Sequence, residues 1–210
     1  MTLLRATPTA IRSYALAFLA VLVPRVSGAQ VKLEVTPYFT SYYATEHLRY
    51  EDASNLERQE AGPGIGAAMT WRFSNIWAME AQATWIRSGI VVKNTGFNNF
   101  EPATDGSLLM VNARILFQPR RTNLFFSLGM GTVRRAGDAY EVQDFDDLSD
   151  VAAIVGVGIR TRVTPNWGFR LGVEVQQFTT NIDLENAYYP KRVQRDVLVT
   201  IGVPFALIGR

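Results

Sequence analysis

Residues 62–88 read GPGIGAAMTWRFSNIWAMEAQATWIRS, and this stretch decides the fold. Apolar side chains occupy every second position on both sides of Ser74-Asn75, from Ile65 to Phe73 and again from Trp77 to Trp85. A period of two residues is typical of a β-strand with one apolar face, because successive side chains point to opposite sides. Ser and Asn favour tight turns. The stretch therefore predicts an antiparallel hairpin with one continuous apolar face.

The same alternation recurs along the rest of the chain. It predicts eight strands, over residues 32–43, 62–73, 76–88, 107–118, 123–134, 150–163, 167–180 and 195–206. The longest uncharged run after the N-terminal region, 197–209, has 13 residues and contains Pro204. A transmembrane helix needs roughly 20 apolar residues, so this run is too short to be one.

The connections between these strands alternate strictly in length. Short turns are predicted at 74–75, 119–122 and 164–166, and long connections at 44–61, 89–106, 135–149 and 181–194. This alternation is typical of membrane barrels, which have short periplasmic turns and long external loops. A soluble sandwich has no reason to keep every second connection short. We therefore predict an all-β fold, an eight-stranded antiparallel up-and-down transmembrane barrel with both ends of the chain on one side.

The lack of hydrogen-bonding partners in the hydrocarbon core of a bilayer leads to the same predicted fold. A sheet in the bilayer must close on itself, because an open edge would leave backbone groups unpaired. We expect the apolar face to contact lipid and the acids and bases of all eight strands to point inward. Aromatic residues near the strand ends suit two interfacial girdles. One girdle is predicted from Trp71, Phe73, Trp77, Phe117, Trp167 and Phe169, and the other from Tyr42, Tyr43 and Trp85.

The first 29 residues have the layout of a cleavable signal peptide. Arg5 and Arg12 precede the apolar run 14–23, and Ser27-Gly28-Ala29 offers small residues before Gln30. An uncleaved anchor helix is the alternative. We expect residues 1–29 to be the signal peptide and 30–210 the barrel domain. Loss of three leader arginines would leave 18 basic and 19 acidic residues, so the basic whole-chain pI does not indicate nucleic-acid binding.

Two hairpins carry a resemblance to a known family. Residues 62–88, and VAAIVGVGIRTRVTPNWGFRLGVEVQQF at 151–178, are similar to the glycine-rich strand, short turn and Glu-containing strand of small outer-membrane barrels of the OmpA/OmpX/OmpW type. The resemblance implies a monomer in the bacterial outer membrane, with lipid and lipopolysaccharide around it, placed there by the insertion machinery. Such barrels usually end in an aromatic residue, whereas here Phe205 is followed by residues 206–210.

The inward-facing charges are the candidate site. An eight-stranded barrel is only wide enough for side chains to fill its interior, and buried charges must then be paired. We predict a structural lumen network centred on Glu80, Arg114, Arg160 and Glu174, with Arg72 and Arg170 beside it. Interior glycines would leave room for the long arginine side chains. A narrow or gated ion path is the alternative use of the same residues.

Other candidate chemistries have weaker signals. His47, the only histidine, could act with Asp105 and Ser107 in a lipid A-modifying enzyme, although a lone loop histidine is usually solvated. The acidic stretch 144–150, with Asp144, Asp146, Asp147 and Asp150, could hold a hard cation but lacks the spacing of a calcium loop. We predict no catalytic residue, metal site or cofactor. The expected role is structural or surface interaction; the alternatives are a conduit for small or hydrophobic solutes and a lipid A-modifying enzyme.

Overall fold

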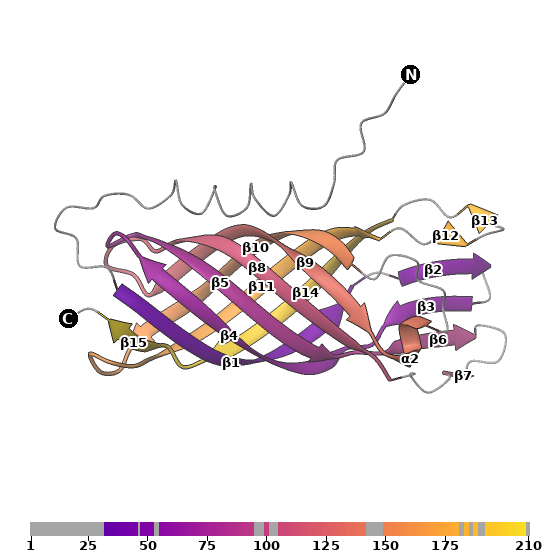
Figure 1. Ribbon diagram of the computed structural model, residues 1–210, viewed down its shortest axis with the longest axis horizontal. Helices are drawn as coiled ribbons and strands as arrows, with labels where there is room; N and C mark the ends of the chain where they lie inside the picture. Colours follow the sequence, from indigo (N-terminus) through magenta and orange to yellow (C-terminus); the bar gives the residue numbers. More distant parts are fainter. Residues whose placement is uncertain are drawn as a thin grey trace, which may run out of the picture.

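The computed structural model describes residues 32–45, 47–52, 55–94, 99–100, 105–141, 149–180, 183–184, 187–188 and 192–208. Long tilted strands wrap into a closed antiparallel barrel (Figure 1). Eight long strands form the barrel wall: β1 (Lys32–Ala44), β4 (Gly62–Arg72), β5 (Trp77–Arg87), β8 (Ser107–Phe117), β9 (Leu124–Ala136), β10 (Ser149–Arg162), β11 (Gly168–Thr180) and β14 (Arg192–Gly202). The predicted fold class is confirmed.

Pairing of β14 with β1 closes the barrel, and the register around it is sheared. Starting at Glu34, the paired residues are Thr70, Glu80, Arg114, Gly129, Ile154, Gln176, Asp196 and finally Ala44. One circuit therefore returns to β1 ten residues further along the strand. Shear of this kind requires strands tilted by roughly 35–45° to the barrel axis, so paired residues do not share a height in the lumen.

The two ends of the barrel differ. At the turn end, residues 73–76, 118–123 and 163–167 join neighbouring strands. Two hydroxyls organise these turns: Ser74 Oγ accepts from the Trp77 amide at 2.9 Å, and Thr164 Oγ1 accepts from the Trp167 amide at 3.2 Å. At the loop end, β2 (His47–Asp52), β3 (Asn55–Gln59), β6 (Ile90–Asn94) and β7 (Asn99–Phe100) form a separate four-stranded sheet, visible at the right of Figure 1.

The predicted long loops thus contain secondary structure of their own. Besides the four-stranded sheet, β12 (Asp183–Leu184) pairs with β13 (Ala187–Tyr188), and α2 (Asp138–Glu141) follows β9. No helix in the described part of the chain is long and apolar enough to cross a membrane. Only the four-residue α2 is helical there.

Burial alternates residue by residue along the wall strands. In β5, Ala78, Glu80, Gln82, Thr84 and Ile86 are buried, while the residues between them are exposed or half-buried. Outward positions carry large apolar side chains, such as Phe39 at 69% exposure and Leu128 at 67%. The inward positions are mainly polar. This is the reverse of a soluble protein and matches a barrel surrounded by lipid.

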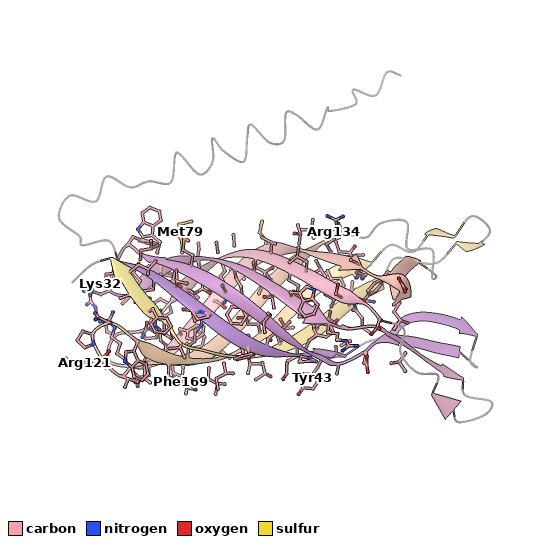
Figure 2. The ribbon with its side chains drawn as sticks, turned by 60° about the horizontal axis from the view of Figure 1, so that its bottom comes forward. Lys32, Tyr43, Met79, Arg121, Arg134 and Phe169 are labelled. Atoms are coloured by element: carbon pink, nitrogen blue, oxygen red, sulfur yellow. The ribbon has the colours of Figure 1, made fainter. Side chains whose placement is uncertain are left out.

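The prediction that every charged residue of the strands points inward was wrong at the loop end. Arg87, Arg134 and Arg195 occupy outward positions, and Figure 2 shows Arg134 on the outer surface. They lie near the loop ends of β5, β9 and β14, where we expect outward side chains to reach the polar membrane interface. Tyr42 shows the opposite error. It was predicted to lie in the outer aromatic girdle, but its side chain is fully buried inside the barrel. Its partners include a lumen carboxylate.

The last predicted strand is also divided. β14 ends at Gly202, and after Val203-Pro204 the chain resumes as β15 (Phe205–Ile208), which pairs with the start of β1. Proline has no amide hydrogen to donate to the ladder, which explains the break. The segment after Phe205 therefore contributes to closure at the turn end.

Close packing of the wall on the lumen predicts one sensitive glycine. A Cβ atom on Gly129 would lie 2.3 Å from the Ala113 carbonyl oxygen and 2.5 Å from the Arg114 Cβ, so Gly129→Ala must displace a backbone or a lumen arginine. We expect it to lower the free energy of unfolding by about 1–3 kcal/mol, the usual cost of overpacking. Denaturant titration in lipid vesicles measures this.

Gly172→Ala is the matched control, because its nearest neighbour would be the Thr200 hydroxyl at 3.0 Å. It should keep both its unfolding energy and the fast migration of the unheated protein on detergent gels. Equal losses in the two variants would contradict the close approach at Gly129.

Candidate functional site

A buried carboxylate in the lumen holds two arginines. Glu80 Oε1 accepts from Arg114 Nε at 2.8 Å and Nη2 at 2.5 Å. Its other oxygen accepts from Arg170 Nη1 and from Thr70 Oγ1, each at 2.6 Å. Arg114 also forms an ion pair with Glu174. All four charged side chains are at most 6% exposed, so this central cluster (Glu80, Arg114, Arg170 and Glu174) is a buried ion network.

The central cluster bridges the lumen from wall to wall. Arg170 on β11 and Glu80 on β5 are four strands apart in the closed sheet, halfway around the barrel. Arg170 also lies over the ring of Phe125 on β9, with its guanidinium carbon 4.5 Å from the ring centroid. Such stacking supports a desolvated guanidinium.

The other two predicted residues belong to a second cluster, near the turn end. Glu34 Oε2 accepts from Arg72 Nε at 3.3 Å and pairs with Arg160, and Glu34 Oε1 is 3.7 Å from Arg162 Nη2. Arg160 thus pairs with Glu34 and not within the central cluster, which corrects the predicted centre of the network. The reason is the shear: Glu34 is linked through the register to Ile154, and tilt places Arg160, six residues along β10, at the height of Glu34.

A third cluster lies at the loop end. The inward position of its carboxylate, Asp196, follows from the alternation in the sequence, whereas its tyrosines and glutamine were not predicted. Tyr42 Oη lies 2.6 Å from Asp196 Oδ2 and 2.7 Å from Gln59 Oε1, and Gln59 Nε2 donates to Tyr140 Oη at 2.9 Å. Tyr140 donates in turn to the Ser88 carbonyl at 3.2 Å. Burial raises the pKa of the Tyr140 phenol, so this side chain remains a neutral donor.

Arg135 and Asp150 complete the loop-end cluster. Arg135 Nη1 donates to Asp150 Oδ2 at 2.6 Å, and the guanidinium of Arg135, fully buried, lies 5.4 Å from the Phe178 ring centroid. The alternation of the strands could have revealed both residues. Tyr42 has the same inward phase as Tyr38, four residues earlier, and Arg135 has the same inward phase as Val133, two residues earlier. The predicted end of the fifth strand at 134 excluded Arg135.

The residues of the rival chemistries are not assembled in the described chain. Asp105 pairs with Arg87, and Ser107 Oγ contacts the Ala136 carbonyl at 3.5 Å. The side chain of His47 and those of Asp144, Asp146 and Asp147 lie outside the described residues. Asp150, the last residue of the acidic stretch, pairs with Arg135. Across the described ranges, no group of three or more metal-ligating side chains comes together.

Glu80 is the residue whose loss should harm the barrel most. Glu80→Ala leaves two buried arginines without their shared acceptor, and breaking such a network typically costs about 3–5 kcal/mol. We expect a loss of that size in the free energy of unfolding, measured by denaturant titration in vesicles.

Asp105→Ala is the matched control, because it also breaks a carboxylate–arginine pair, but one whose side chains are 69% and 80% exposed. Solvent screens that pair, so no resolvable change is expected. A Glu80→Ala protein as stable as the control would show that the central cluster contributes nothing to stability.

Solved structures with the same architecture share little sequence with this chain. The outer membrane protein OprG from Pseudomonas aeruginosa matches with a TM-score of 0.57 and 12% identity, covering 86% of this chain and 97% of its own. AlkL, determined in lipid bilayers, matches with a TM-score of 0.54 and 10% identity over 89% and 95%. Neisserial surface protein A matches with a TM-score of 0.50 and 13% identity over 83% and 96%. At these identities the likeness shows the fold.

The sequence itself carries the family signal. None of the curated proteins matches it. The family model described as the outer membrane protein beta-barrel domain matches residues 14–192, most of the chain. With the closed antiparallel wall, its apolar outer face and its charged lumen, this match places the protein in the bacterial outer membrane, and the chain belongs to the outer membrane protein beta-barrel domain family.

Proposed function

We propose that this protein is a non-conducting, non-enzymatic outer-membrane barrel with a structural or surface-interaction role. The observation that carries the proposal is the central cluster, in which the Arg170–Glu80 pair spans the lumen and Arg114 joins Glu80 to Glu174. An eight-stranded barrel has room for side chains and little else. A permeating ion would have to break paired, desolvated charges.

The other two clusters support the same function. The Glu34 cluster lies below the central cluster toward the turn end, and the Tyr42–Asp196–Gln59–Tyr140 chain lies at the loop end. Charged or polar side chains therefore fill three successive levels of the lumen. The parts of the molecule that remain for interaction are its two ends, including the four-stranded sheet and the other loop-end segments.

Lipopolysaccharide is the proposed partner at the loop end. Arg87, Arg134 and Arg195 point outward there, from β5, β9 and β14. Arg87 has Asp105 as partner, whereas Arg134 and Arg195 have no ion pair within the described part of the chain. Guanidinium groups bind phosphate through paired hydrogen bonds. Outward arginines at the interface thus suit the phosphates of the surrounding outer leaflet.

Single-channel recording tests the closed lumen. The wild-type protein in planar bilayers should give no discrete conductance steps in concentrated KCl. The Arg114→Ala/Arg170→Ala double variant removes the two bridging side chains and exposes Glu80 and Glu174, so it should admit cations. Regular steps from the wild type, at a size like those of the double variant, would contradict the proposal and favour the narrow channel.

Lipopolysaccharide binding is tested separately, through stability. Adding lipopolysaccharide to the vesicles should raise the unfolding free energy of the wild type, because a ligand that binds only the folded state stabilises it. The Arg134→Ala/Arg195→Ala variant should lose most of that increase, while Lys32→Ala, at the turn end, should retain it. The same increase in all three proteins would rule out the loop-end arginines as the contact.

A further inference from the structure

The turn end of the barrel contains a large open cavity. It has a volume of about 1250 Å³ and is built by the turns between β4 and β5 and between β8 and β9, together with the ends of β1 and β10. Figure 2 shows Lys32 and Arg121 at this same end, away from Arg134 and Tyr43. In a barrel of this family the short turns face the periplasm, so the cavity opens to that side.

The lining of this cavity is strongly cationic. Six basic side chains line it and no acidic one does: Lys32, Arg72, Arg120, Arg121, Arg160 and Arg162. Glu34 lies just inside and contacts Arg72, Arg160 and Arg162. One carboxylate therefore faces three arginines, and Lys32, Arg120 and Arg121 have no ion pair within the described residues. The mouth therefore has a large excess of positive charge, and its low-dielectric walls focus the electric field of these cations.

The turn that carries two of these arginines is strained. Arg121 has a φ of 65°, the left-handed conformation that Gly and Asn adopt more readily than a long side chain. The Thr122 hydroxyl donates to the Pro119 carbonyl at 3.2 Å and holds the turn. A left-handed arginine costs stability, so folding alone gives no reason for a cation at this position.

The positive lining continues into the lumen. A small inner cavity shares Arg72, Ile76, Gln118 and Arg160 with the mouth and is also lined by Arg170. Arg170 is 5% exposed, and its Nη2 atom is buried without a hydrogen-bond partner. An unsatisfied nitrogen on a guanidinium that lines this inner cavity is a second feature that suits a hydrogen-bond acceptor nearby.

We propose that this periplasmic mouth is a binding site for phosphate-type anions. Arginines that approach from β4, β10 and the β8–β9 turn can donate to a group with oxygens on all sides, which phosphate offers. The anion would be either a soluble polyanion of the periplasm or the phosphate of a lipid headgroup at the inner leaflet. The site lies on the turn side of the central cluster, so it does not depend on whether the lumen conducts.

Calorimetric titration of the reconstituted protein tests the site. In nanodiscs of zwitterionic phosphatidylcholine, inorganic tripolyphosphate should bind the wild type, with affinity that falls as salt rises. Arg121→Asn removes one cation and suits the left-handed turn, so it should fold normally and bind about tenfold more weakly. Arg120→Gln is the second variant and should weaken binding in the same direction. Arg87→Asn removes an equal charge at the other end, from an arginine already paired with Asp105, and should leave the affinity unchanged.

Anionic lipid then separates the two sources of phosphate. When phosphatidylglycerol replaces part of the phosphatidylcholine, a headgroup in the mouth would abolish the difference between wild type and Arg121→Asn, whereas a soluble ligand would leave that difference intact. Either result supports a phosphate site and identifies its occupant. The proposal is overturned if tripolyphosphate does not bind the wild type in phosphatidylcholine, or if it binds wild type, Arg121→Asn and Arg87→Asn equally.

Discussion

A strand that crosses hydrocarbon must pair every backbone N–H and C=O with another strand, because no water is present to do so. The β14–β1 pairing meets this requirement by closing the sheet, and β15 extends the closure along the start of β1. Closure of eight wall strands with a ten-residue shear fixes the tilt of the strands and the width of the interior. The rest of the structure follows from that width.

A narrow interior must be filled, and here charged, polar and apolar side chains fill it together. Three levels of ion pairs and hydrogen bonds cross it, with the Glu80 carboxylate holding two arginines in the middle. Glycines such as Gly129 keep the wall close to these side chains. Apolar residues could fill the same volume, and replacing buried ion pairs in that way is often neutral or stabilising in other proteins. The narrow width of the barrel therefore does not by itself require a charged filling.

The two rims have different electrostatics. At the loop end, single arginines point outward from separate strands, while the inward groups there are paired with one another. At the turn end, six cations converge on one cavity with a single carboxylate inside it. The outward arginines of the loop end face the surrounding membrane. The converging cations of the turn end face any molecule that enters the cavity. Because the bilayer separates them, the two rims meet different environments, and function is to be sought at each separately.

The sequence by itself determined the eight wall strands, most of their inward and outward faces, and the short and long connections. It also assigned to the lumen the six charged residues Glu80, Arg114, Arg160, Glu174, Arg72 and Arg170. These are local properties, because a period of two and a turn signal are legible within a dozen residues. The tertiary structure alone decided the partners: Arg160 with Glu34, Arg135 with Asp150, and Tyr42 with Asp196. Lumen contacts form at equal height in a sheared barrel, and the height of each residue depends on the register of every strand before it. A single sequence does not contain that register, because it arises only when the sheet closes.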